Sequence, residues 1–208
     1  MSVVPNITAP TALPPALEGF ASFLREAVES GVEFKPGETV QFSWVWFQVA
    51  GDENSLRVTA PETGRTPMEF GDDCSAALNL VLQQRYVADS FELECGWCHA
   101  LQSAIVIKDL ESCEQWFMNR TDAEEGTTSG WYIGAEDSDL EVNDSANLEL
   151  RSLWELSCLR SEMTELFLLP QGTVVVLDET PRVLTDDGRV PLEDSYYAQK
   201  YPDSLVGP

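Results

Sequence analysis

The stretch between Arg120 and Arg151 most constrains how this chain can fold, because it contains nine carboxylates and no lysine or arginine. Acidic side chains are almost never fully buried without partners, so this stretch must lie largely at the surface. A solvated surface and a docking face for a basic protein both explain such a run. The nine residues are Asp122, Glu124, Glu125, Glu136, Asp137, Asp139, Glu141, Asp144 and Glu149.

The charge of the whole chain disfavours nucleic acid as a direct partner. The 208 residues include 36 acidic and 12 basic ones, which gives a net charge of -24. Residues 1–100 contain 14 acidic and 5 basic residues, whereas residues 101–208 contain 22 and 7, so the second half has the stronger negative field. That field repels phosphates, and we therefore expect no binding to DNA or RNA.

The composition is that of a folded protein of the cytoplasm. Hydrophobic residues make up 43% of the chain and aromatic residues 10%, which is enough for a core. No apolar run approaches the roughly 20 residues needed to cross a bilayer, and the N-terminus lacks the pattern of a signal peptide. An odd number of cysteines fits reduced thiols better than a disulfide framework. They are Cys74, Cys95, Cys98, Cys113 and Cys158.

We predict an α+β fold with two small domains, each an antiparallel sheet covered by one or two helices. A flexible, proline-rich lead over residues 1–14 precedes an N-terminal domain over residues 15–93. A linker over residues 94–102 then leads to an acidic C-terminal domain over residues 103–208.

The first domain is predicted to contain a helix, a hairpin and a second helix. Apolar residues recur at helical spacing between Pro14 and Gly31, which indicates an amphipathic helix. Residues 39–60 are rich in aromatic and β-branched side chains around a turn after residue 50, which favours a hairpin. Asp72 or Asp73 can cap the helix that follows.

In the second domain, short apolar runs predict a small antiparallel sheet. These runs cover residues 104–107, 116–118, 131–133 and 173–177. Apolar residues at helical spacing over residues 148–159 predict one helix that covers the sheet.

The run from Cys95 to His99 matches the C-x-x-C-H motif by which c-type haem is attached. Covalent attachment of haem requires an exported chain, and no export signal is found. A catalytic redox pair requires its first thiolate at a helix N-terminus, whereas a strand is predicted to follow Cys98. Zinc could be bound by Cys95, Cys98 and His99 with Cys74 or Cys113, but a second close pair of ligands is missing. We favour partly buried structural thiols and expect no metal and no cofactor.

A calcium loop is also a weak interpretation. Asp137, Asp139 and Glu141 resemble the beginning of an EF-hand loop, but Val142 stands where glycine is needed and Leu148 where a bidentate acid is needed. Weak binding of a divalent ion by these carboxylates remains an alternative.

Catalytic motifs are sparse. The chain has one histidine, His99, so a nucleophile activated by histidine would have to be built around it. The sequence contains neither a Walker phosphate loop nor a G-x-G-x-x-G motif. We therefore expect a protein that is not an enzyme.

Residues 103–178 resemble the C-terminal module of a bacterial immunity-protein family from polymorphic toxin systems, formerly a domain of unknown function. The most specific element is the Ser129-Gly130-Trp131 step with the acidic run after it. Residues 15–93 are similar to the N-terminal domain with which family members often pair this module. The other matching segments are Ala104 to Ile107, Trp116 to Arg120, Gly134 to Asp137, Asn143-Asp144 and Leu166 to Thr173.

The resemblance implies an inhibitor that is encoded beside a toxin and binds it 1:1, in a type VI secretion system of bacterial competition. The negative charge favours a cationic toxin, and a DNase is the expected one because nucleases have basic clefts for phosphate. The expected partner-binding residues are Trp131, Glu136, Asp137, Asp139, Glu141 and Asp144. An acidic adaptor or scaffold without a toxin partner is the alternative, followed by a thiol or metal protein that uses Cys95, Cys98 and His99.

Overall fold

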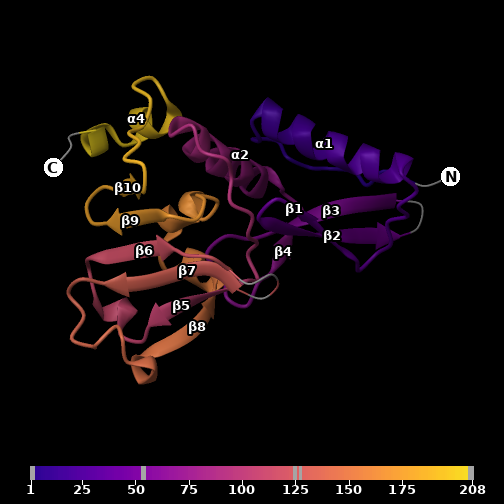
Figure 1. The fold of residues 1–208 in the computed structure, drawn as a ribbon. Helices are drawn as coiled ribbons and strands as arrows, with labels where there is room; N and C mark the ends of the chain where they lie inside the picture. The colour runs from indigo at the N-terminus through magenta and orange to yellow at the C-terminus, as the bar shows by residue number, and fades with distance from the viewer. Residues whose placement is uncertain (1–2, 53–54, 124–125, 127, 206–208) are drawn as a thin grey trace. The chain divides into compact units, whose positions relative to one another are not determined.

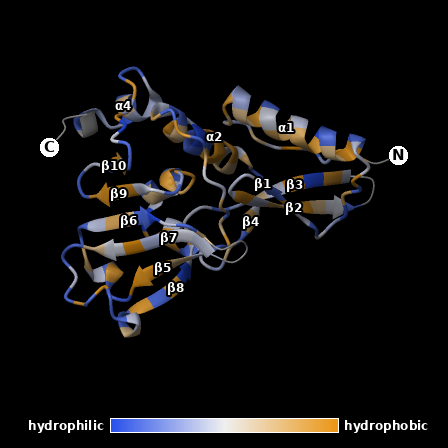
Figure 2. Cartoon of the chain, in the orientation of Figure 1, coloured by the Kyte–Doolittle hydropathy of each residue, from blue (hydrophilic) through white to orange (hydrophobic). Residues whose placement is uncertain are grey.

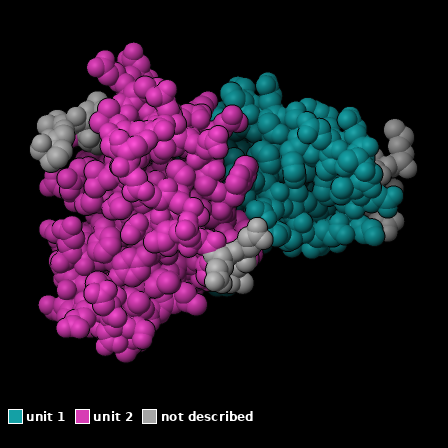
Figure 3. Space-filling model, in the orientation of Figure 1, with its two compact units in different colours: residues 1–83 teal, residues 84–208 magenta. Residues whose placement is uncertain are grey.

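A computed structural model shows a mixed α+β protein (Figure 1). It describes residues 3–52, 55–123, 126 and 128–205. The chain divides into two compact units, residues 1–83 and 84–208 (Figure 3), and each is described here by itself. The division falls inside the helix α2 (Ser75–Ser90), before the boundary predicted near residue 93. Within the described residues, no helix is both long and apolar enough to cross a membrane.

The first unit contains one helix and one four-stranded antiparallel sheet, followed by the first half of α2. The sheet has the order β1-β2-β3-β4. Its elements are α1 (Pro14–Glu29), β1 (Thr39–Phe42), β2 (Val45–Asp52), β3 (Ser55–Pro61) and β4 (Phe70–Gly71).

The core of the first unit lies between α1 and the sheet. Hydrophobic and hydrophilic residues alternate along α1 in Figure 2, and Phe20 and Leu24 are buried on one side of the helix. Val45, Phe47 and Val49 of β2 are buried in alternation, and the ring of Phe47 stacks on that of Phe20 with centroids 4.3 Å apart. The helix between Pro14 and Gly31 is therefore confirmed, with the proline in the first turn where it costs no hydrogen bond.

Two details of the first unit differ from the sequence-based predictions. Residues 39–50 do not form one strand, because a turn at Ser43 and Trp44 divides them into β1 and β2. The proline-rich lead contains two isolated bridges, in which Asn6 pairs with Arg57 and Thr8 pairs with Asp73. The lead is thus hydrogen-bonded beside β3 in the part that the structure describes.

The second unit is built on a six-stranded sheet with the order β10-β9-β6-β7-β5-β8. Its strands are β5 (Ser103–Ile107), β6 (Trp116–Arg120), β7 (Thr128–Ala135), β8 (Leu148–Ser152), β9 (Thr173–Leu177) and β10 (Arg182–Thr185). The helical elements are α3 (Leu153–Leu159), α4 (Tyr196–Lys200) and the 3-10 segments η1 (Leu110–Ser112), η2 (Ser145–Asn147), η3 (Ser161–Leu166) and η4 (Pro202–Leu205).

The predicted α+β class is confirmed, but this sheet is mixed and not antiparallel. β5 and β7 run parallel, with Ile105 opposite Tyr132, while the other neighbouring strands are antiparallel. β7 forms a hairpin with β6 and lies between β6 and β5 in the sheet. The order of strands in the chain did not reveal this, because pairing depends on contacts between distant residues.

The single helix predicted over residues 148–159 is a strand followed by a helix. Leu148 to Ser152 extend the ladder beside β5, and Leu150 lies opposite Ile105. The α-helix begins only after Ser152, whose hydroxyl accepts the Glu155 N–H while the Glu155 carboxylate accepts the Ser152 N–H, a capping box. Sheet pairing therefore overrides the helical spacing of the first five residues.

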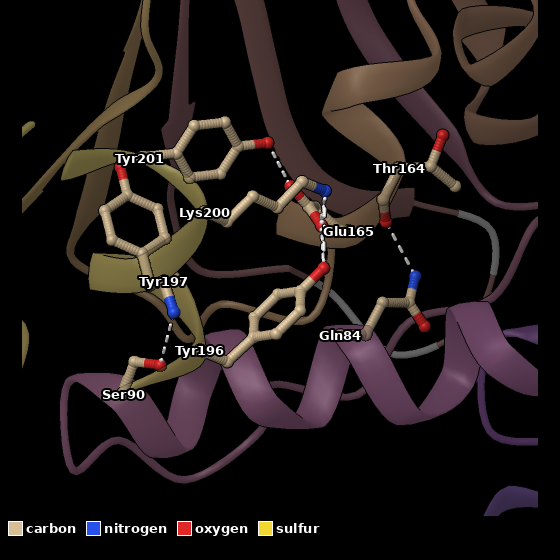
Figure 4. A network of polar contacts seen from close by, with 8 residues as sticks. All are labelled: Gln84, Ser90, Thr164, Glu165, Tyr196, Tyr197, Lys200 and Tyr201. Atoms are coloured by element: carbon tan, nitrogen blue, oxygen red, sulfur yellow. Dashed lines mark hydrogen bonds and ion pairs between the residues drawn. The ribbon is translucent and has the colours of Figure 1, made fainter. Parts of the chain in front are cut away.

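A buried carboxylate fixes the C-terminal elements of the second unit (Figure 4). Glu165 in η3 is 3% exposed and accepts hydrogen bonds from the Tyr196 hydroxyl (3.0 Å), from Lys200 Nζ (2.6 Å) and from the Tyr201 hydroxyl. Burial and this carboxylate raise the pKa of Tyr201 far above its ordinary value. The Gln84 side chain donates to the Thr164 carbonyl (2.7 Å), so η3 is tied to both α4 and the second half of α2.

Candidate partner-binding surface

Three connections of the second unit meet at one end of the six-stranded sheet, on the left in Figure 1. Residues 108–115 join β5 to β6, residues 136–147 join β7 to β8, and residues 178–181 join β9 to β10. They meet because β5 and β7 are parallel and end together, while β6 begins beside the ends of β7 and β9. We call these three segments the acidic end.

The acidic end contains ten carboxylates and a single cation, Lys108, whose Nζ donates to the Ala146 carbonyl. Nine of them are exposed and one, Asp109, is half-buried. The ten are Asp109, Glu111, Glu114, Glu136, Asp137, Asp139, Glu141, Asp144, Asp178 and Glu179. This density creates a strong local negative potential at one place on the unit.

Some of these carboxylates hold the two longer connections together. Asp137 accepts the backbone N–H groups of Glu114 (2.8 Å) and Gln115 (3.1 Å), and these bonds keep the pKa of Asp137 below its ordinary value. The Ser138 hydroxyl donates to the carboxylate of Asp109 at 2.9 Å. The segments 108–115 and 136–147 therefore form one surface and not two independent loops.

Other carboxylates are committed to local contacts. Asp144 accepts the Ala146 N–H at 2.9 Å and caps η2. Glu111 pairs with Arg151 at 2.6 Å, and Asp178 pairs with Arg182 at 2.8 Å. These bonds shape the ends of the connections and neutralise part of the charge.

Five exposed carboxylates of the acidic end make no side-chain hydrogen bond or ion pair with any residue that the structure describes. They are Glu114, Glu136, Asp139, Glu141 and Glu179. Three of the predicted binding residues, Glu136, Asp139 and Glu141, are in this free group. Asp137 and Asp144, also predicted, bind backbone N–H groups instead. The free group is what a basic partner could contact without breaking internal bonds.

Half of this surface was not predicted from the sequence. The sequence predicted only residues from the long run after Trp131, whereas Asp109, Glu111, Glu114, Asp178 and Glu179 come from two other connections. The available signal was that Asp109, Glu111 and Glu114 lie between two predicted apolar strands, and that Asp178 and Glu179 directly follow another. Only the strand pairing shows that the three connections meet.

Trp131 lies in the core and not on this surface. Its side chain is 1% exposed, and its indole N–H donates to the Phe167 carbonyl at 3.1 Å. The same carbonyl accepts Arg120 Nη1 (3.0 Å) and the Cys98 thiol (3.1 Å). The Ser129-Gly130-Trp131 step thus helps to anchor the residues after η3, and the ring of Trp131 cannot touch a partner in this structure.

The side chains of the segment from Cys95 to His99 are arranged as structural groups and not as a redox or metal site. Burial raises the pKa of the Cys98 thiol to about 11 and also raises the pKa of Cys95, so both thiols stay protonated at neutral pH. Burial lowers the pKa of His99, which favours its neutral form. Within the described residues, no three His, Cys, Asp or Glu side chains are grouped so that they could hold a metal ion.

Arg120 holds this segment in place. Its guanidinium, 4% exposed, donates to the carbonyls of Gly96 (3.1 Å), Trp97 (3.1 Å), Phe167 and Leu169. A hollow of about 580 Å³ opens beside it, lined in part by Cys95 and the exposed side chain of Trp97. The segment therefore acts as a cross-connection between strand β6 and the chain after η3.

The fold and the acidic end suit a protein that binds a cationic partner. The geometry offers protonated thiols, structural carboxylates, and a surface of free carboxylates whose chemistry is electrostatic recognition of cations. The comparison with known families then identifies the protein more closely. The Imm33-like domain matches residues 83–186, and the chain belongs to this family. No curated protein and no solved structure matches the chain.

The family gives the role of the chain. Imm33-like proteins are immunity proteins of polymorphic toxin systems, and this chain neutralises a cognate toxin without being an enzyme. The match begins beside the start of the second unit and includes all six strands of its sheet. The predicted immunity role and the expectation of a non-enzyme are confirmed by this membership.

Proposed function

We propose that the chain neutralises its toxin by placing the acidic end against a basic surface of the toxin, and that the toxin is a nuclease that cleaves DNA. The observation that supports this most is the free group of five carboxylates, gathered from three connections at one end of the family-matched sheet. A nuclease needs a basic cleft to bind phosphates, and carboxylates can occupy such a cleft in place of phosphates.

The charge also supports rapid association. Opposite charges steer two proteins into encounter and raise the association rate constant from about 10⁵–10⁶ M⁻¹s⁻¹ toward 10⁸–10⁹ M⁻¹s⁻¹ at low salt. An immunity protein benefits from this speed because the toxin must be captured before it reaches its substrate. We propose a 1:1 complex formed in the cytoplasm, against a toxin delivered by a type VI secretion system.

Neutralising the free carboxylates tests the role of the acidic end. The probe is the toxin domain encoded by the gene next to the gene of this chain. The variant Glu136→Gln, Asp139→Asn, Glu141→Gln removes three negative charges that make no internal bond. We expect the association rate constant, measured by stopped flow, to fall roughly tenfold at low salt and to depend less steeply on ionic strength.

A matched control removes the same charge elsewhere. Glu18→Gln, Glu26→Gln, Glu29→Gln changes three exposed residues of α1 and gives the same net charge. Equal loss of association rate in the two variants would show that only the net charge matters and would refute a specific acidic end. Incubating the toxin domain with plasmid DNA tests the second part, because intact DNA would exclude a DNase.

A further inference from the structure

One face of the six-stranded sheet carries an uninterrupted row of side chains that runs across all six strands. The strand register places Leu184 opposite Val174, Val174 opposite Asn119, Asn119 opposite Tyr132, Tyr132 opposite Ile105, and Ile105 opposite Leu150. Residues opposite one another on neighbouring strands lie on the same face of a sheet. Five of the six positions in this row are apolar or aromatic.

The row is open to solvent at both edges of the sheet and partly open in the middle. The exposed fraction is 54% for Leu184, 43% for Ile105 and 66% for Leu150, and the three central residues are half-buried. By contrast, the residues that alternate with them, such as Met118, Ile133 and Val175, are fully buried on the opposite face. The exposed leucines and isoleucine are therefore not part of the core of the unit.

A second, shorter row widens the apolar surface toward the acidic end. Phe117 lies opposite Gly134 and next to Val176, and both Phe117 and Val176 are half-buried. The ring of Phe117 lies over Gly134, because a Cβ atom added there would come within 2.6 Å of the ring. Gly134 is followed by Ala135 and then Glu136, so this row ends where the acidic end begins. We call the two rows together the open face.

The open face is large enough to form part of a protein–protein interface. The whole sheet face, six strands about 4.8 Å apart and about five residues long, spans roughly 400 Å², and the open face occupies part of it. The largest apolar patch on a soluble monomer is of this order and is often a functional site. A stable interface covers about 800 Å² on each partner, with an apolar centre and a polar rim. The open face and the adjoining acidic end together fit that description.

We infer that the open face is the apolar centre of the toxin interface, and that the toxin has an apolar patch bordered by lysine and arginine residues that meet the acidic end. This inference rests on the proposed basic toxin. A second copy of the chain is the wrong occupant, because it would bring together two molecules of net charge -24 and two acidic ends. Burial of Ile105 and Leu150 would govern how slowly the complex dissociates, while the carboxylates govern how fast it forms.

The double variant Ile105→Thr, Leu150→Thr tests the open face. Threonine is β-branched, a shape that strands favour, and both replaced side chains are exposed, so the fold should persist. We expect the dissociation rate constant of the complex with the neighbouring-gene toxin domain to rise roughly thirtyfold, with little change in the association rate constant. The matched control is Val190→Thr, Leu192→Thr, which changes two residues that are 78% and 50% exposed and lie outside the sheet.

The acidic-end variant, measured against the same toxin, separates this inference from the proposed function. If the Ile105→Thr, Leu150→Thr variant still dissociates slowly while the acidic-end variant associates more slowly, the open-face inference is overturned and the proposed function stands. If the Ile105→Thr, Leu150→Thr variant dissociates fast while the acidic-end variant associates at the normal rate, the open face is supported and the acidic end is refuted. Sedimentation of the free chain checks the occupant: a dimer that the double threonine variant disrupts would overturn the toxin assignment. Leu150→Gln alone repeats the test if the double variant fails to fold, with circular dichroism as the check.

Discussion

The two faces of the six-stranded sheet come from the same strands but differ in what their side chains do. On the buried face, Arg120 and Trp131 lie opposite each other, and both side chains donate hydrogen bonds to the Phe167 carbonyl, directly after η3. On the open face, Asn119 and Tyr132 are the neighbouring pair, within a row of apolar side chains that nothing in the described second unit fully covers. In the proposed arrangement, residues that stabilise the fold and residues that contact the toxin alternate along the same strand, one step apart.

If this separation is correct, changes on the buried face should lower stability without altering the affinity of the folded protein for its toxin. The largest effect is expected for Arg120→Met. The variant removes the donor from the buried Leu169 carbonyl and from the part-buried Gly96 and Trp97 carbonyls, and leaves the Phe167 carbonyl to Trp131 and Cys98. We therefore expect the free energy of unfolding to fall by about 3 kcal/mol. Urea unfolding measures this change. A loss below about 1 kcal/mol would mean that the carbonyls find other partners and that Arg120 is not the anchor.

Trp131→Phe should have a smaller effect of the same kind. It removes the indole N–H bond to Phe167 and part of the contact with Arg120, whose Cζ atom lies 5.5 Å from the ring centroid. We expect a loss of about 1–2 kcal/mol in urea unfolding, from the lost bond and the small cavity. Toxin binding, measured by calorimetry below the melting temperature, should keep its dissociation constant. A large loss of affinity with unchanged stability would place Trp131 in the interface after all.

Tyr132→Phe on the open face should give the smallest effect, and in the opposite direction. The Tyr132 hydroxyl is shielded and has no hydrogen-bond partner in the part of the chain that the structure describes, and burial raises its pKa. Removing an unsatisfied hydroxyl should raise the free energy of unfolding by about 0.5–1 kcal/mol. Thermal unfolding followed by fluorescence provides the measurement, and a decrease in stability would show that the hydroxyl is satisfied in solution.

The sequence by itself determined the features that depend on neighbouring residues and on composition. The helix between Pro14 and Gly31, the apolar strands of the second half, the α+β class and the immunity family all follow from local patterns. The surface position of Glu136, Asp139 and Glu141 also followed, because runs of carboxylates cannot be buried without partners.

The tertiary structure alone decided which distant residues meet. The parallel pairing of β5 and β7 brings three acidic connections to one end, and the register aligns Ile105, Tyr132 and Leu150 in one row. The same pairing buries Trp131, which the sequence placed at the partner surface. Local patterns specify whether a residue can lie in a strand, but the face it occupies depends on a register set by long-range contacts, and a shift of one residue exchanges the two faces.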